Sequence, residues 1–395
     1  MSGSIVNMYN KTVYALSLQT DALTRLQEQV STGSRVNRAS DDPSDAYRIL
    51  ALNTQERSLE SYQENIIDLT GVLEISSTIL TDMNGRLTDM LALLTQIVGG
   101  VQGPEAPARL ASTVDDMLEQ VISLANTKYS NQYLFGGNKT NRPPYVVHYE
   151  GDKIASVTYQ GSDEARATEV ADAVLVEGYR AGNDMFQVDN RKIPEFLGET
   201  GAASGTGTST VRGDVWLTVE HDGTNYQISI DDGATFVPVP AGGMANQAVT
   251  DSRTGRVLYV DTTGISSTGV EFVRVPGTYD VFNTLINLRD LLLNDRDIPT
   301  QELLSYVNEG IAAVREVQGL LGQANVSVGS EIHFLEQLKD NMEDVQFDAQ
   351  DQTSYLQDAD VAQIAVDLSR LEILYQMSLS VTAKLMSTSL LDFIG

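Results

Sequence analysis

Residues 52–97 read LNTQERSLESYQENIIDLTGVLEISSTILTDMNGRLTDMLALLTQI, and this stretch decides how the chain folds. A branched aliphatic residue returns at every seventh position: Leu52, Leu59, Ile66, Leu73, Leu80, Leu87 and Leu94. Several positions three residues further on are apolar too, among them Leu69, Met83 and Ile97. A seam with this period predicts one long helix that packs against other helices. Periodicity alone leaves open whether the seam faces the chain's own core or another subunit.

A short polar segment precedes this helix. Residues 31–48 read STGSRVNRASDDPSDAYR. Gly33 can adopt the left-handed conformation that ends a helix. Asp42 is suited to cap the next helix, because Pro43 has no N–H to leave unsatisfied and Asp45 places a carboxylate at the positive end of the helix dipole. The segment is therefore predicted to be a joint between two helices.

Two arginines stand beside the paired carboxylates of this joint. Asp41 and Asp42 could form an acid–base pair, but a helix cap next to Arg35 and Arg38 is the simpler interpretation. We expect the arginines to bind these carboxylates or those of a neighbouring molecule. Replacing Arg35 with Glu is accordingly predicted to leave the monomer folded and to weaken assembly.

Further helices are expected towards both ends of the chain. Apolar residues recur at helical spacing in five more segments. These are residues 9–30, 108–126, 279–292, 300–321 and 330–356. Glycines at 319, 322 and 329 are expected to separate the last two segments into two helices. A final helix is expected from the motif DADV at 358–361 to the C-terminal end. Because a lone amphipathic helix is marginal in water, the two terminal helices should pair with each other or with other subunits.

The middle of the chain has a different character. Residues 140–276 alternate apolar and polar residues between turn signals, and EGDK, HDGT and DDGA are predicted to be hairpin turns. The segment GETGAASGTGTST at 198–210 is expected to be a flexible linker or long loop between two small β units. The predicted fold is therefore a multidomain α+β protein. Its N- and C-terminal segments form a nested helical coiled-coil or bundle rod around a central all-β insert.

Composition limits the function. The chain has 54 acidic and 26 basic residues and a net charge of −28, so nucleic acid is not an expected partner. It has no cysteine, which excludes disulfides and thiolate sites. No apolar run approaches the ~20 residues of a membrane span, so membrane insertion is not expected. The N-terminus lacks the basic and apolar regions of a cleavable signal peptide.

The sequence offers little catalytic chemistry. The three histidines, His148, His221 and His333, lie in different regions and lack the spacing of metal ligands. Phosphate-binding and nucleophile motifs are absent. We therefore expect no catalytic, cofactor-binding or metal site, and an enzyme in the insert is the least supported function. A coiled-coil adhesin that binds host surfaces through the insert remains an alternative.

Several motifs carry a family resemblance. STGSRVNRASDDPSDAYRIL at 31–50 resembles the N-terminal segment of the flagellin-like family, and Pro43 and Ser44 favour its branch of hook–filament junction proteins. The segments at 131–145, 181–186, 277–292 and 358–395 are similar to that branch and follow in the family order. The resemblance covers about half the chain. Residues 198–276 depart from the pattern and are expected to form an enlarged outer domain.

The resemblance implies a non-catalytic structural subunit of the bacterial flagellum. It would be extracellular, exported through the flagellar type III apparatus, and located in a ring between hook-associated protein 1 and flagellin. An export chaperone would cover its C-terminal helix. A flagellin that forms the bulk filament is the alternative.

The resemblance also implies how the chain is divided. Residues 1–40 and 357–395 would form coiled-coil helices of an inner tube, and 41–139 with 277–356 a helical rod. Residues 140–197 and 198–276 would be outer β domains. The expected assembly interface comprises Leu16, Leu23, Val30, Arg35, Arg38, Asp41, Asp42, Leu368, Tyr375, Leu385, Leu390 and Leu391. The terminal helices are expected to be disordered in the free monomer.

Overall fold

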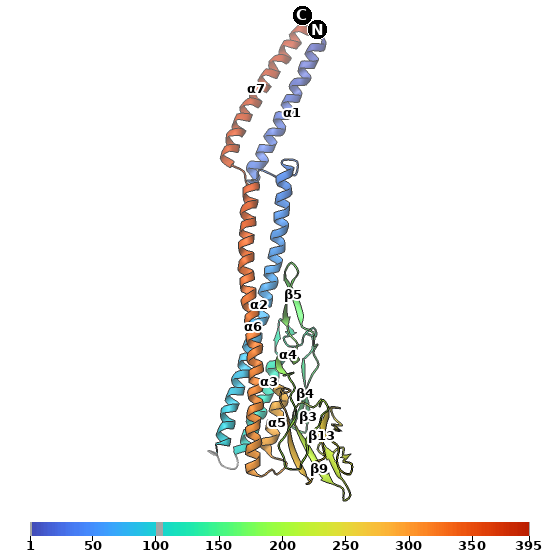
Figure 1. Cartoon of the computed structure of the whole chain (residues 1–395). Coiled ribbons are helices and arrows are strands. Elements are labelled where there is room, and N and C mark those ends of the chain that lie inside the picture. The colour runs from blue at the N-terminus through green and yellow to red at the C-terminus, as the bar shows by residue number, and fades with distance from the viewer. Residues whose placement is uncertain (1, 100–105, 395) are drawn as a thin grey trace. The chain divides into compact units, whose positions relative to one another are not determined.

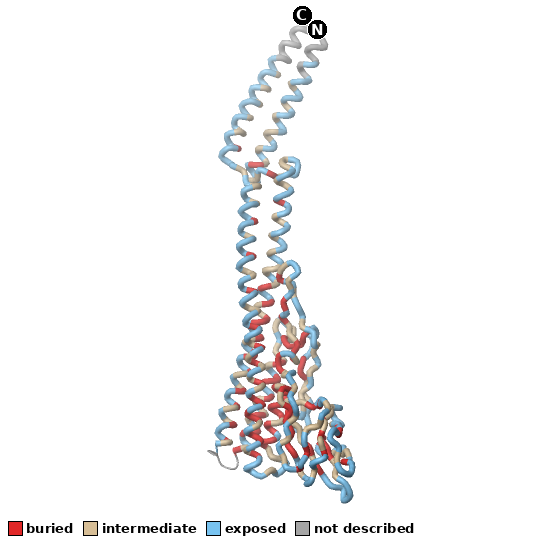
Figure 2. Tube along the Cα trace, viewed as in Figure 1, coloured by how far each residue is buried: buried red, intermediate tan, exposed pale blue. Residues whose placement is uncertain are grey.

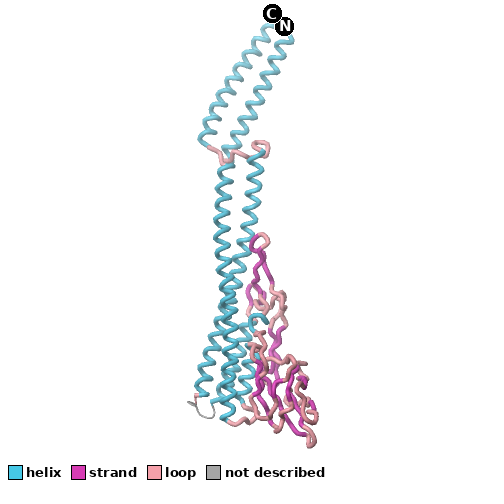
Figure 3. The backbone as a smooth tube through the Cα atoms, in the orientation of Figure 1, coloured by secondary structure: helices cyan, strands magenta, loops and turns pink. Residues whose placement is uncertain are grey.

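The computed structural model describes residues 2–99 and 106–394, and the side chains at 2–6, 8, 9 and 385–394 are outside this description. The chain forms two compact units. The first contains residues 1–64 and 337–395, and the second contains residues 65–336. Helices make up both ends of the chain and the strands lie between them in sequence (Figures 1 and 3). The predicted α+β class, with helical termini around a central β insert, is confirmed.

The first unit is entirely helical apart from its connections. Helices α1 (Ser2–Thr32) and α7 (Val361–Ile394) lie side by side (Figure 1). The unit also contains the start of α2 (Pro43–Val98) and the end of α6 (Thr300–Gln357). The Asp360 carboxylate accepts a hydrogen bond from the Gln363 backbone N–H at 3.0 Å, which caps the start of α7 as the DADV motif predicts.

The second unit has a helical core. It combines the remainder of α2 and α6 with α3 (Ala106–Ala125) and α5 (Val281–Leu293). The heptad residues from Ile66 to Leu94 are buried, whereas Leu52 and Leu59 in the first unit are only half-buried (Figure 2). For residues 66–94, the heptad seam therefore faces the chain's own core.

Helix α6 corrects one expectation. The glycines at 319, 322 and 329 do not interrupt it, and residues 300–357 form one continuous helix. Each interior glycine costs a helix about 1 kcal/mol relative to alanine. The buried side chains of Val314, Val317, Leu321 and Val328 anchor this segment of α6 in the core and offset that cost.

The β insert belongs to the second unit and consists of short antiparallel pairings. Three sheets are two-stranded: β1 (Lys128–Tyr129) with β2 (Gln132–Tyr133), β3 (Tyr145–Glu150) with β4 (Lys153–Tyr159), and β5 (Arg166–Ala171) with β6 (Val174–Tyr179). The short helix α4 (Gly182–Phe186) follows β6.

Two larger sheets follow α4. A five-stranded sheet has the order β11-β10-β9-β14-β7, and a three-stranded sheet has the order β12-β13-β8. Their strands are β7 (Glu195–Phe196), β8 (Ala203–Ser204), β9 (Gly213–His221), β10 (Tyr226–Ser229), β11 (Val237–Pro238), β12 (Gln247–Thr250), β13 (Val257–Asp261) and β14 (Gly269–Val275). The three predicted turns join β3 to β4, β9 to β10 and β10 to β11, as expected.

The segment 198–210 is not a flexible linker. Strand β8 within it pairs with β13, and the Ser209 hydroxyl accepts a hydrogen bond from the Tyr259 backbone N–H at 3.0 Å. Thr200 is buried, and its N–H donates to Glu271 at 3.2 Å. Strand β7, which precedes the expected boundary at 197/198, pairs with β14 of the five-stranded sheet. The segment is therefore a folded loop, and its glycines allow the backbone to pass close to neighbouring segments.

Candidate assembly site

The most distinctive site in the first unit is the joint predicted at residues 31–48. It connects α1 to α2, and it lies against a second connection, between α6 and α7. Ser34 and Asp358 form an isolated antiparallel bridge. The Arg35 N–H donates to the Gln357 carbonyl at 2.6 Å, and the Ala359 N–H donates to the Gly33 carbonyl at 2.9 Å. Two segments more than 300 residues apart in sequence therefore hydrogen-bond to each other.

Local sequence explains why the chain turns here. Gly33 has a φ of +71°, the left-handed conformation that was predicted, and its N–H donates to the Gln29 carbonyl at 2.9 Å. The buried Gln29 side chain donates in turn to the Arg35 carbonyl at 2.8 Å. Val36 is buried beside these contacts. The end of α1 and the start of the joint are thus tied together by backbone and amide groups.

Arg35 joins three parts of the site. Its guanidinium forms an ion pair with Asp45, lies 3.4 Å from the Asp42 carboxylate, and donates to the Leu356 carbonyl at 2.9 Å. Asp42 and Asp45 belong to the start of α2, and Leu356 belongs to the end of α6. The sequence predicted the contact with Asp42 but gave no signal for Asp45 or Leu356 as partners.

The Asp42 carboxylate caps the start of α2. Asp42 accepts from the Asp45 and Ser44 backbone N–H groups, each at 3.1 Å, so the predicted N-cap is present. Hydrogen bonds from these N–H groups, with Arg35 nearby, lower the pKa of Asp42.

Asp41 closes the turn inside the joint. It accepts from the Arg38 N–H at 2.9 Å and the Asn37 N–H at 3.2 Å, and these bonds lower its pKa. Arg25 of α1 lies 3.5 Å from the same carboxylate. The Arg38 guanidinium pairs with Glu28 at 3.0 Å instead of with either aspartate.

The terminal helices expose apolar side chains. Leu16, Leu23, Leu368 and Tyr375 are half-buried, and Val30 is exposed. Leu385, Leu390 and Leu391 lie outside the described side chains. Each helix also has large apolar residues open to solvent: Val13, Tyr14, Leu18 and Val30 on α1, and Val361, Val366, Ile373, Leu374, Met377, Leu379 and Val381 on α7. Pairing α1 with α7 therefore covers only part of the apolar surface of either helix.

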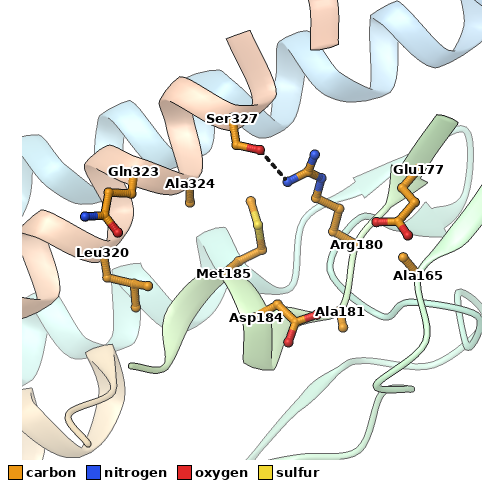
Figure 4. Close-up of a pocket in the computed structure, with 10 residues that line it drawn as sticks. All are labelled: Ala165, Glu177, Arg180, Ala181, Asp184, Met185, Leu320, Gln323, Ala324 and Ser327. Carbon is orange, nitrogen blue, oxygen red and sulfur yellow. Dashed lines mark hydrogen bonds between the residues drawn. The ribbon is translucent and has the colours of Figure 1, made fainter. Parts of the chain in front are cut away.

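A hollow in the second unit offers a different kind of site. It has a volume of about 270 Å³ and lies between α4, the end of β6 and α6, with Met185, Leu320 and Ala324 among its lining residues (Figure 4). Arg180 on its wall donates to the Ser327 hydroxyl at 3.3 Å and pairs with Glu331.

Within the part of the chain that the structure describes, there is no group of three or more carboxylates and histidines that could hold a metal ion. Across residues 2–99 and 106–394, no helix has the length and hydropathy to cross a membrane.

Two protein-family models match this chain, one in each terminal region. The family model described as the bacterial flagellin N-terminal helical region matches residues 4–140, and that of the bacterial flagellin C-terminal helical region matches residues 304–394. Together they cover more than half of the sequence. The chain belongs to the flagellin family. The expected resemblance is confirmed, and the joint lies inside the N-terminal match.

Curated flagellar proteins match part of the chain. Flagellar hook-associated protein 3 of Salmonella typhimurium is 23% identical over 190 residues, which are 48% of this chain and 58% of that protein. Flagellin A of Helicobacter pylori is 26% identical over 173 residues, which are 43% of this chain and 34% of that protein. The chain therefore spans between about one third and three fifths of the length of these relatives.

Two solved structures of flagellar proteins share the fold of this chain. The hook-associated protein 3 of Legionella pneumophila aligns with a TM-score of 0.53 and 18% identity, covering 78% of this chain and 98% of that one. FlgL of Xanthomonas campestris aligns with a TM-score of 0.52 and 17% identity, covering 76% and 98%. Nearly the whole of each of these chains is therefore represented here.

Proposed function

We propose that this flagellin-family chain is a structural junction subunit of the bacterial flagellum, of the hook-associated protein 3 type. It joins hook-associated protein 1 to the flagellin filament and has no catalytic or cofactor-dependent role. The observation that carries the proposal is the α1–α7 pair, which is held by the two hydrogen-bonded connections and still exposes apolar residues on both helices. The fold shared with two junction-protein structures supports it.

The exposed apolar surface provides the driving force for assembly. Burying apolar area stabilises an association by roughly 25 cal/mol per Å². In a single chain the outer sides of α1 and α7 face water, so packing against copies of the same helices lowers the free energy. We include assembly through the terminal helices, with self-association in a ring, in the proposal, and the exposed apolar side chains on α1 and α7 support it.

The same surface requires protection before assembly. An uncovered apolar helix promotes aggregation. An export chaperone that covers α7 in the cell would prevent this, and export through the flagellar type III apparatus needs no cleavable signal peptide. We include both in the proposal, with an extracellular location at the hook–filament junction.

A flagellin of the bulk filament is the second candidate. The observation in its favour is that curated flagellins match the same chain at similar identity. Adhesion and catalysis have no comparable support.

Seeded assembly separates the two candidates. The purified chain is added to hook fragments that carry hook-associated protein 1, then flagellin is added, and the products are followed by light scattering and negative-stain microscopy. Addition of the chain to those ends only, followed by growth with flagellin, supports the junction subunit. Long filaments from this chain alone would instead make it a flagellin.

A further inference from the structure

Large aromatic side chains are exposed on the helices of the first unit that lie beyond the joint. Phe347 and Tyr355 on α6 are 70% and 87% exposed, and Tyr47 and Leu50 on α2 are 75% and 61% exposed. These residues lie in the segments 43–64 and 337–357, so they are not part of the apolar surface of α1 and α7 described above. Isolated exposed apolar residues are common, but two sets on facing helices suggest a surface for association.

These residues lie on the outer edges of a helix pair. The two segments run antiparallel, because Arg35 contacts both the start of α2 and the end of α6. Their inner sides meet at the buried residues Ile49, Met342 and Ala349. With 3.6 residues per turn, Tyr47 projects from the side of α2 opposite Ile49, and Leu50 and Arg57 project from its flank. We name these three residues the α2 edge. Asp344, Phe347, Asp348, Asp351 and Tyr355 project from the opposite side of α6, which we name the α6 edge.

The two edges are complementary in charge. The α6 edge has exposed carboxylates at 344, 348 and 351, and none of them has an ion-pair partner among the described residues. Like charges four residues apart destabilise a helix, so an external cation would relieve the repulsion. The α2 edge contains no carboxylate, and its exposed Arg57 has no ion-pair partner in the described chain.

The two edges also match in height. Gln350 of α6 donates to Glu56 of α2 at 2.5 Å, so these two residues stand at the same level in the antiparallel pair. Counting from this contact in opposite directions, Arg57 is level with Ala349, one residue from Asp348, and Leu50 is level with Leu356, one residue from Tyr355. Each offset is about 1.5 Å along the helix axis. Two copies placed side by side at equal height would therefore bring arginine to aspartate and leucine to tyrosine.

We infer that the α2 edge of one copy docks on the α6 edge of a second copy of this chain. The contact joins different surfaces, so repeating it builds a ring when the rotation closes. This inference rests on the proposed function for its biological setting, since a ring is the assembly that a junction requires. It adds which surfaces of the helix pair make contact and in which order the copies follow one another.

Charge exchange provides the test. Arg57→Glu and Asp348→Lys are each expected to reduce self-association about tenfold or more, because each turns an attraction between close interfacial charges into a repulsion. The double variant should regain self-association with itself but fail to assemble with the wild-type chain. Arg109→Glu, an exposed position on α3 with no ion-pair partner among the described residues, is the matched control and should assemble normally.

Cross-linking tests the order of the copies. The chain has no cysteine, so introduced thiols have no background. A mixture of Leu50→Cys and Tyr355→Cys chains should give disulfide-linked dimers on mild oxidation, and either chain alone should not. Dimers from one variant alone would indicate a symmetric contact and overturn the inference, as would normal self-association of both single charge variants.

The test of this contact and the test of the proposed function can fail independently. Growth of flagellin on hook ends reports the function, and charge-dependent cross-linking reports the contact. If the wild-type chain supports flagellin growth, and Leu50→Cys and Tyr355→Cys chains that also carry Arg57→Glu still cross-link normally, the contact alone is overturned. If Arg57→Glu instead blocks only addition to hook-associated protein 1, the α2 edge binds that protein and the inference is wrong.

Discussion

Arg35 is the side chain that ties the joint together. Its ion pairs with Asp42 and Asp45 and its bond to the Leu356 carbonyl link the start of α2 to the end of α6. Composition at 31–48 was sufficient to predict a helix end at Gly33, a cap at Asp42 and a role for the arginines, since these are local preferences. The contact with Leu356 could not be predicted, because Arg35 bonds to its backbone carbonyl and every residue has such a carbonyl.

Arg35→Glu is predicted to weaken assembly without unfolding the monomer. The side chain is partly exposed, and the buried core of the second unit does not involve it. The new carboxylate would face Asp42 and Asp45 and loosen the joint that holds α1 beside α7. Circular dichroism should show unchanged helix content, while seeded assembly should slow severalfold. Arg35→Lys, which keeps the charge, should assemble better than the Glu variant. A collapsed circular dichroism spectrum would contradict the prediction.

At the scale of elements, α6 shows how packing overrides local signals. Three glycines pointed to an interruption, yet 58 residues form one helix. The strands of the insert agree better with expectation, because alternation and turn residues specify hairpins locally. The glycine-rich segment at 198–210 is folded because its partners, β13 and Glu271, come from elsewhere in the chain.

Gly322→Ala is predicted to stabilise the second unit. A Cβ added at this position would meet nothing within 4 Å, and alanine favours the helix by about 0.5–1 kcal/mol. The midpoint of denaturant unfolding should rise accordingly. Gly310→Ala is the matched control, since its Cβ would lie 3.1 Å from the Leu288 side chain and should give a smaller gain or a loss. A lower midpoint for Gly322→Ala would refute the prediction.

The link between β9 and its neighbours is predicted to depend on pH. Burial raises the pKa of Asp214 to about 6, although Tyr279 donates to it at 2.6 Å and Arg274 lies 3.5 Å away. A folded pKa above the unfolded value of about 3.9 means that the stabilisation is fully present below pH 4 and is lost as pH rises through 6. Thermal unfolding of the second unit should therefore occur at lower temperature at pH 7 than at pH 4.5.

Asp214→Asn provides the comparison for this effect. The amide keeps an oxygen that can accept from Tyr279 but does not titrate. Its melting temperature should vary less between pH 4.5 and 7 than that of the wild-type chain. Equal pH dependence in the two proteins would assign the effect to other groups.

At the scale of the whole molecule, stability is distributed unevenly. The second unit has a continuous buried core, whereas α1 and α7 have mainly each other and keep many apolar side chains in water. Local opening concentrates where few buried contacts exist. Because of this difference, we expect α1 and α7 to open more readily than the core of the second unit in a free chain.

Limited proteolysis is predicted to trim both ends of the free monomer. A fragment of roughly the middle three-quarters of the chain should persist, because cleavage follows exposed and weakly held backbone. Mass spectrometry of the digest identifies its ends. The same digestion on assembled ends should spare α1 and α7. Intact termini in the free monomer would show that the α1–α7 pair is stable alone.

The sequence by itself determined the features that depend on near neighbours along the chain. These are the helical ends, the β insert, the long heptad helix from Leu52 to Leu94, the caps at Gly33 and Asp42, and the flagellin-like motifs. Helical period, turn residues and capping side chains act within a few positions, so a sequence displays them directly.

Only the tertiary structure decided which distant segments meet. It paired Ser34 with Asp358, kept α6 continuous through its glycines, and folded 198–210 against β13. It also divided the heptad seam into a buried part from Ile66 and a half-buried part before it. These outcomes depend on contacts between residues far apart in the chain, where packing and long-range hydrogen bonds outweigh local preference.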